Sequence, residues 1–153
     1  MGKQSAGLLV FRSTEDVTEV LLVHPGGPFY ENKNDGAWSI PKGEYKDTED
    51  MLEAACREFS EETGMSIEGS FISLGNIKQK SGKTVHAWAV GGDIDVARLR
   101  SNTFTMEWPP RSGSMHEYPE VNKAEWFTMD AAKEKILPEQ AEFLVRLEKI
   151  LKG

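Results

Sequence analysis

The residues with the clearest chemical potential are three closely spaced glutamates, Glu58, Glu61 and Glu62. In a helix they would occupy positions i, i+3 and i+4, so their side chains would emerge from one face and repel one another. Several converging carboxylates supply the hard oxygen ligands that Mg²⁺ or Mn²⁺ prefers, and a bound cation would offset the repulsion. A solvated acidic face is the alternative interpretation of such a cluster, and the residues around it decide between the two.

The glutamates belong to a longer pattern, which reads G-x5-E-x7-R-E-apolar-x-E-E-x-G and is followed by the apolar Met65. The fixed positions of this pattern are Gly43, Glu49, Arg57, Glu58, Phe59, Glu61, Glu62 and Gly64. This highly specific motif resembles the Nudix box, so the sequence resembles the Nudix hydrolases. The resemblance implies an α/β/α sandwich around a mixed β-sheet, in which the box forms a loop, a helix and a loop. It also implies an enzyme that cleaves nucleoside diphosphates linked to another group.

The resemblance assigns roles to residues of the box. Glu58, Glu61 and Glu62 become the carboxylates that bind Mg²⁺ or Mn²⁺, and the carbonyl oxygen of Gly43 becomes a further ligand. Lys42, directly before Gly43, is a candidate substrate-binding residue, because an ammonium group can donate to a phosphate oxygen as a point charge.

Two further box residues, Arg57 and Glu49, are expected to support the site by orienting the loop and the helix. Arg57 could also pair with Glu53, one helical turn earlier. The alternative for these charges is an ordinary surface ion pair, which contributes little to stability.

An additional catalytic carboxylate is expected outside the box. In some Nudix enzymes a later loop carries it six residues before a tryptophan, and Glu120 has this relation to Trp126. Glu120 therefore ranks first, followed by Glu117 and Glu107. Glu120 or Glu58 would act as the general base, and His116 could contact the substrate.

Other features carry weaker signals. Lys80–Thr84 resembles a phosphate-binding P-loop, but Ile77 stands where that motif requires glycine, so a hairpin turn is expected. His24, His86 and His116 share no metal-ligand spacing, and a hydrogen-bonded structural role is favoured for His86. Aromatic side chains in polar or glycine- and proline-rich loops could stack on a base or pin their loops, and the sequence does not rank them: Phe29, Tyr30, Trp108 and Tyr118.

Composition limits the class of protein. The chain has 153 residues, of which 39% are hydrophobic and 28% are charged, as expected for one globular domain spanning 1–153. The formal net charge of -7 argues against general nucleic-acid binding or binding to an anionic membrane. A single cysteine, Cys56, excludes an intramolecular disulfide framework and favours the cytoplasm. The expected partner is a nucleotide-type small molecule, and the sequence leaves the oligomeric state open.

Hydrophobic patterning predicts the elements that position these residues. The expected strands are Ala6–Phe11, Glu19–His24, Trp38–Ile40, Phe71–Gln79, Thr84–Val90, Thr103–Trp108 and Ala124–Phe127. A helix capped by Asp47 or Thr48 should run to Thr63 and stop at Gly64. A C-terminal helix, Glu139–Leu151, should bury one face, formed by Ala141, Leu144, Leu147 and Leu151.

These observations predict a metal-dependent pyrophosphohydrolase that cleaves a phosphoanhydride of a nucleoside diphosphate derivative. Dinucleoside polyphosphates are the first substrate class, because the run from Trp38 to Gly43 and the loop Pro25–Phe29 resemble those hydrolases. Nucleotide sugars or ADP-ribose and nucleoside triphosphates are the alternatives. A non-enzymatic alternative is a ligand-sensing Nudix domain, which usually has eroded box residues or an added DNA-binding segment.

Overall fold

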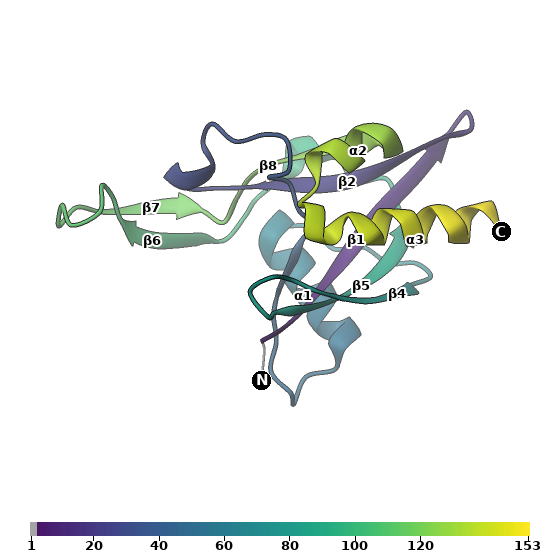
Figure 1. The fold of residues 1–153 in the computed structure, drawn as a ribbon, viewed down its shortest axis with the longest axis horizontal. Helices are drawn as coiled ribbons and strands as arrows, with labels where there is room; N and C mark the ends of the chain where they lie inside the picture. Colours follow the sequence, from purple (N-terminus) through teal and green to yellow (C-terminus); the bar gives the residue numbers. More distant parts are fainter. Residues whose placement is uncertain (1–2) are drawn as a thin grey trace.

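In the computed structural model, which describes residues 3–153, a mixed six-stranded sheet forms the centre of the molecule (Figure 1). Its strands are β1 (Gln4–Thr14), β2 (Val17–Pro25), β3 (Lys42–Glu44), β4 (Ile72–Lys78), β5 (Thr84–Gly91) and β8 (Val121–Thr128). They follow the order β4-β5-β1-β2-β8, and β3 pairs with β1. Strands β1 and β5 are parallel, whereas the other neighbours are antiparallel, so the sheet is mixed.

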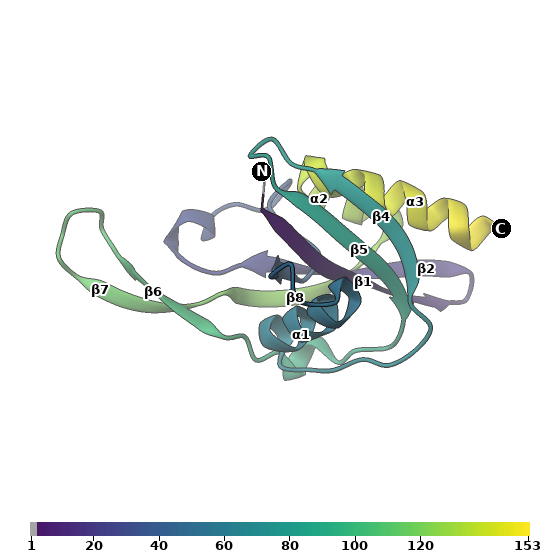
Figure 2. The same cartoon turned by 90° about the horizontal axis from the view of Figure 1, so that it is seen from below.

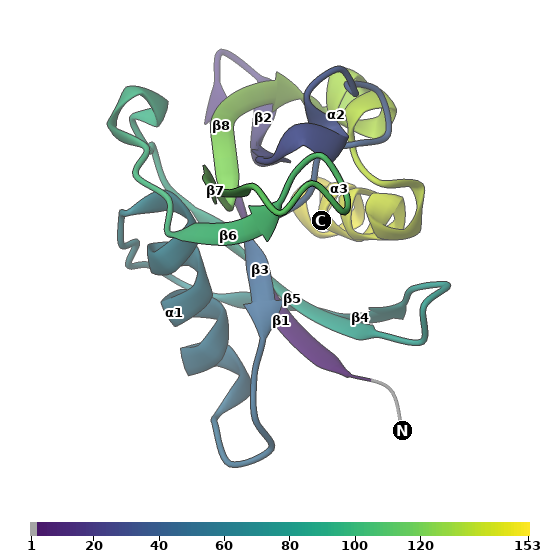
Figure 3. The same ribbon diagram turned by 90° about the vertical axis from the view of Figure 1, so that its left-hand side faces the viewer.

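Helices cover both faces of this sheet (Figures 2 and 3). Helix α1 (Met51–Thr63) lies on one face, and α2 (Met129–Lys135) and α3 (Ala141–Lys152) lie on the other. Because strand side chains alternate between faces, β1 contributes to two separate cores. One core joins Leu9 of β1 to Phe143, Leu144 and Leu147 of α3. The other joins Ala6, Leu8 and Val10 of β1 to Ala54, Ala55 and Phe59 of α1. The predicted α/β/α sandwich is confirmed.

Two strands leave the sandwich. Strands β6 (Thr103–Glu107) and β7 (Met115–Pro119) form a separate two-stranded sheet, which projects from one end of the molecule (Figure 1). The sequence predicted β6 but missed β7, because the segment MHEYP lacks the regular apolar alternation of a half-buried strand.

The start of α1 differs from the prediction. The capping residue is Asp50, whose carboxylate accepts a hydrogen bond from the backbone N–H of Glu53 at 3.0 Å. Asp47 and Thr48 do not cap the helix, because a turn closed by Glu49 N–H on Lys46 C=O at 2.9 Å precedes it. The predicted stop at Gly64 is confirmed.

The predicted strand Trp38–Ile40 is also wrong as an extended element. Only isolated bridges occur there, between Val23 and Ser39 and between Trp38 and Ile136. The chain pairs more regularly just beyond Pro41, where β3 lies antiparallel to β1. Strand β3 has only three residues and is polar, so hydrophobic patterning could not predict it.

The C-terminal region contains one unpredicted helix. Thr128 caps α2 by accepting from Ala131 N–H, and a short 3-10 turn, Pro138–Gln140, leads into α3. In α3 the predicted apolar face is buried at Leu144 and Leu147, whereas Leu151 at the helix end is 40% exposed.

The turn between β4 and β5 tests the P-loop alternative. The helices test whether the chain could span a membrane. Gln79 N–H donates to Lys83 C=O at 2.8 Å, which confirms a hairpin turn rather than a P-loop. Among residues 3–153, every helix is too short or too polar to span a bilayer.

Candidate active site

Helix α1 presents the box glutamates at its C-terminal half. Gly64 ends the helix in the left-handed conformation, with φ of 74°, and its N–H donates to Ser60 C=O at 2.8 Å. A side chain at Gly64 would also meet Arg100 C=O at 2.6 Å, so glycine is required by conformation and by space. This sharp stop places Glu58, Glu61 and Glu62 in the last two turns, directly before the chain leaves the helix.

Glu58 lies against the backbone of β3. Glu58 is only 9% exposed, and a Cβ atom at Gly43 would lie 1.9 Å from Glu58 Oε2. The pairing of Gly43 with Ala6 of β1 holds that backbone in place. Glycine at position 43 therefore makes room for the Glu58 carboxylate, a role that the sequence analysis missed.

Arg57 links the loop before α1 to the glutamates of the helix. Its guanidinium donates twice to Glu49, from Nε at 2.9 Å and from Nη2 at 3.0 Å, and Nη1 donates to Glu58 at 2.9 Å and to Glu61 at 3.2 Å. These hydrogen bonds hold the pKa of Glu49 below its usual value. Within residues 3–153 the ion pairs of Arg57 go to these three acids and not to Glu53. These bonds hold the guanidinium between the loop before α1 and two of the box glutamates.

Glu62 has fewer compensating partners. Its carboxylate accepts a hydrogen bond from the backbone N–H of Lys42 at 3.2 Å, yet burial raises its pKa to about 8. Burial, followed by the charge of Glu61, also raises the pKa of Glu58. The pKa of the Lys42 ammonium is lowered by burial and by the charge of Lys83. The charges of Glu62, Glu44 and Glu58 raise the pKa of Lys42 in opposition, so this residue lies beside the acidic cluster.

The structure brings Glu120 close to the box, although it is far away in the sequence. The negative charge of Glu120 contributes to the raised pKa of both Glu58 and Glu62. Its backbone N–H donates to Asn102 C=O at 2.8 Å, and Asn102 N–H donates to Glu61 C=O at 3.0 Å. These bonds fasten the segment between β7 and β8 to the C-terminal end of α1.

The two lower-ranked acids lie on the projecting hairpin. Glu107 accepts hydrogen bonds from Arg111 N–H at 2.8 Å and Gly113 N–H at 3.2 Å, so its carboxylate closes the hairpin turn. Glu117 lies within β7, opposite Thr105. The ranking of Glu120 ahead of both stays a prediction.

The carboxylate oxygens of this cluster are ligands that a hard divalent cation prefers. Two crowded carboxylates, Glu58 and Glu62, have raised pKa values because burial and neighbouring negative charge disfavour their ionised forms. A divalent cation bound between them would relieve both effects. Over residues 3–153, however, no three His, Cys, Asp or Glu side chains converge closely enough to hold an ion, since Arg57 bridges Glu58 and Glu61. Ligation by all three glutamates therefore requires rotation of side chains around Arg57.

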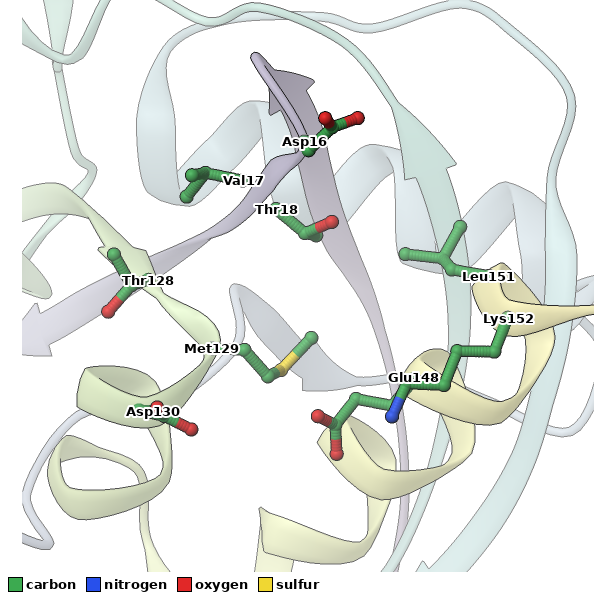
Figure 4. Close-up of a pocket in the computed structure, with 9 residues that line it drawn as sticks. All are labelled: Asp16, Val17, Thr18, Thr128, Met129, Asp130, Glu148, Leu151 and Lys152. Atoms are coloured by element: carbon green, nitrogen blue, oxygen red, sulfur yellow. The ribbon is translucent and has the colours of Figure 1, made fainter.

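Two depressions of the surface differ in whether box residues line them. A depression of about 650 Å³ is lined by Glu44, Tyr45, Lys46, Glu49 and Arg57, beside the box. Another groove, of about 440 Å³, lies between the β1–β2 turn, the start of α2 and the end of α3 (Figure 4). No box residue lines this second groove, so it is not part of the candidate active site.

The remaining candidate side chains have structural surroundings. The ring of His24 is buried and lies within hydrogen-bond distance of Asn122 Oδ1 and Lys33 C=O. His86 Nε2 lies 2.8 Å from Gln4 Oε1, which agrees with the hydrogen-bonded role favoured from the sequence. Cys56 packs beside the α1 core, and burial raises the pKa of its thiol.

Comparison with known proteins identifies the family. The model of the NUDIX domain matches residues 1–147. No curated protein sequence matches this chain. Among solved structures, an Ap4A hydrolase from C. elegans, crystallised as a binary complex, is 23% identical, with a TM-score of 0.66 and coverage of 99% of this chain and 98% of that one.

Two further structures share the fold. The NUDIX domain of Shewanella oneidensis NrtR, in complex with ADP ribose, is 13% identical, with a TM-score of 0.66 and coverage of 99% and 89%. A MutT protein from Methanosarcina mazei Go1 is 20% identical, with a TM-score of 0.64 and coverage of 99% and 96%. These similarities establish the fold, and the NUDIX model spans nearly the whole sequence. The chain belongs to the Nudix hydrolase family, as the motif from Gly43 to Met65 predicted.

Proposed function

We propose that the protein is a metal-dependent pyrophosphohydrolase that cleaves a phosphoanhydride of a nucleoside diphosphate derivative. The observation that carries this proposal is the seating of Glu58 between Gly43 and Arg57, with Glu61 and Glu62 on the same helix. A neutral ligand would not offset the repulsion among these carboxylates. It suits a polyanion that arrives with a cation, which supplies the positive charge that the carboxylates lack.

Glu58, Glu61, Glu62 and the carbonyl oxygen of Gly43 would hold Mg²⁺ or Mn²⁺. The ion, when bound, neutralises phosphate charge and activates water for attack. Arg57 keeps Glu58 and Glu61 oriented through its hydrogen bonds, while its pairing with Glu49 ties the helix to the preceding loop.

The protein's own groups would carry the proton transfer. Glu58 or Glu120 takes the proton from the attacking water as general base, which typically contributes about 10²- to 10⁴-fold to the rate. Lys42 donates to a phosphate oxygen and helps to position the diphosphate. Attack at one phosphorus breaks the phosphoanhydride and releases a nucleotide and a second phosphorylated product.

Dinucleoside polyphosphates remain the first substrate class. Support comes from the run Trp38–Gly43 and from the similarity to the C. elegans Ap4A hydrolase over almost the full length of both chains. ADP-ribose is the second candidate class, since the similar Shewanella NrtR domain was crystallised with ADP ribose. Ligand sensing without turnover is disfavoured, because every fixed position of the box is intact.

The test is hydrolysis of a panel containing Ap4A, ADP-ribose, a nucleotide sugar and nucleoside triphosphates, with Mg²⁺ and chromatographic identification of both products. The matched control is Glu61→Gln, which keeps the size of the side chain and removes one ligand charge. We expect turnover of at least one compound by the wild-type protein and loss of most of it in the variant. Absence of turnover across the panel, or equal rates for the two proteins, would contradict the proposal.

A further inference from the structure

A pair of aromatic rings, one exposed and one half-buried, joins the loop after β2 to the projecting hairpin. The ring of Phe29 meets that of Trp108 edge to face, with centroids 5.1 Å apart and an interplanar angle of 75°. Phe29 lies in the 3-10 turn Pro28–Tyr30 and is 57% exposed. An apolar ring that is left this open contributes little to a core and is free to contact a ligand.

One face of the hairpin is aromatic and is turned towards this loop. Phe104 of β6 lies opposite Tyr118 of β7, and their rings are 6.0 Å apart. A side chain at Gly27 would come within 3.0 Å of the Phe104 ring, so the loop runs directly over the hairpin. The opposite face carries Met115, which pairs with Glu107 and is 60% exposed.

The backbone fixes both segments that carry the pair. Trp108 N–H donates to Ser114 C=O at 2.9 Å, and the Glu107 carboxylate accepts from two N–H groups of the hairpin turn. The loop is anchored where Gly26 N–H donates to Glu120 C=O at 3.0 Å. A side chain at Gly26 would overlap Pro119 C=O at 1.9 Å, which shows how closely loop and hairpin base approach. The two rings are thus held in advance of any ligand.

The loop that carries Phe29 is anchored to the segment that carries Glu120. Gly26 bonds to Glu120, whose charge acts on Glu58 and Glu62, and Phe29 is only three residues from Gly26. Three residues span at most about 11 Å even when extended. The aromatic pair therefore belongs to a loop that is anchored beside Glu120, the acid whose charge acts on Glu58 and Glu62.

We propose that Phe29 and Trp108 form the nucleobase-binding platform of this protein, on which the base of the substrate stacks while its phosphates reach the box glutamates. Stacking on aromatic side chains tolerates any base, because every base has a π face. The platform rests on the proposed function, since it assigns the nucleoside end of the same substrate. Phe29 offers an open ring, and Trp108 packs against that ring in a T-shaped contact.

The test compares two non-hydrolysable probes that differ only by the nucleoside. α,β-Methylene-ADP carries a base, ribose and two phosphoryl groups, whereas methylenediphosphonate carries the phosphoryl groups alone. Binding of each probe with Mg²⁺ is measured by calorimetry for the wild type, Phe29→Leu, Trp108→Leu and the control Met115→Leu. Leucine keeps apolar bulk without a ring, and Met115 lies on the opposite face of the hairpin.

Loss of the Phe29 ring should weaken α,β-methylene-ADP about 5- to 100-fold and leave methylenediphosphonate unchanged. Trp108→Leu should act in the same direction, and Met115→Leu should match the wild type. Unchanged binding of both probes to the Phe29 variant overturns the platform, as does an equal loss for both probes, which would indicate a structural role.

Sedimentation of the same proteins tests a second copy of the chain as the occupant. A wild-type dimer that Phe29→Leu converts to a monomer would show that the rings serve self-association, and the platform would be wrong. A wild-type protein that binds neither probe refutes the proposed function itself. Binding of both probes without any effect at Phe29 refutes only the platform.

Discussion

Substitution of Gly43 by alanine tests whether the backbone of β3 positions Glu58. A Cβ atom at this position would lie 1.9 Å from Glu58 Oε2 and 2.1 Å from Glu58 Cδ. To reach the 3.4 Å of ordinary contact, the Oε2 atom must retreat by about 1.5 Å. A displacement of about 1 Å in a reacting group can cost about 10²-fold in rate. We therefore expect Gly43→Ala to lower kcat by about 10²-fold or more.

The fold should tolerate this change. The clashing atoms belong to the end of a flexible side chain, and Gly43 does not have the positive φ that would strain an alanine. Alanine also reduces the entropy of the unfolded chain, worth about 0.4–1 kcal/mol, which partly offsets the weakened contact between Glu58 and Arg57. Thermal unfolding should show a change within about 1 kcal/mol in the free energy of unfolding.

Steady-state kinetics on the best substrate of the panel provides the assay. Gly91→Ala is the matched control, because a Cβ atom there would meet only Phe11, at an ordinary 3.6 Å. If Gly43→Ala acts through Glu58, adding it to Glu58→Gln should lower kcat little further, because the effects of substitutions at contacting residues do not add. A wild-type kcat for Gly43→Ala, or full additivity with Glu58→Gln, would refute this account of the site.

Three further predictions address the loop acid, the cation and a half-buried histidine, His86. Glu120→Gln should lower kcat by about 10²- to 10⁴-fold with little change in thermal stability, whereas Glu117→Gln should retain most activity; the reverse result would mean that the wrong loop acid was chosen. Excess EDTA should abolish turnover, and Mg²⁺ at about 100 times its Kd should add about 2.7 kcal/mol to the free energy of unfolding, measured by thermal melts. Turnover after verified metal removal would exclude the mechanism. Burial lowers the pKa of His86, so its neutral form is favoured in the fold; its contribution to stability should be full above about pH 6.5 and decline below it. His86→Gln should remove this loss on acidification, and parallel melting curves of wild type and variant from pH 7.5 to 5.5 would contradict the assignment.

Much of the fold was predictable because its signals are local. The apolar stripe of α1, its stop at Gly64 and the apolar runs of β1, β2 and β5 lie within short windows, where periodicity and caps identify elements directly. The missed elements lacked such signals. Strand β3 is only three residues long, and β7 is mostly exposed, so their pairing partners define them rather than their own sequences.

The candidate site likewise has one part that the sequence predicted and one part that only the structure shows. The spacing of Glu58, Glu61 and Glu62 on one helix follows from 3.6 residues per turn, and the pairing of Arg57 with Glu49 was expected from the motif. The wider reach of Arg57, to Glu58 and Glu61, is visible only in the structure. The catalytic roles of these residues remain predictions until the variants are measured.

The sequence by itself determined that this chain carries a complete Nudix box on an amphipathic helix, because the pattern depends only on residue types and on local helical geometry. Only the tertiary structure decided that Gly43 shelters the Glu58 carboxylate, that Glu120 joins the acidic cluster, and that Phe29 meets Trp108. The physical reason is that these contacts join segments distant in the chain. They depend on which strands pair and where a hairpin leaves the sheet, and those choices are settled by the burial of two cores on opposite faces of β1 rather than by any local pattern.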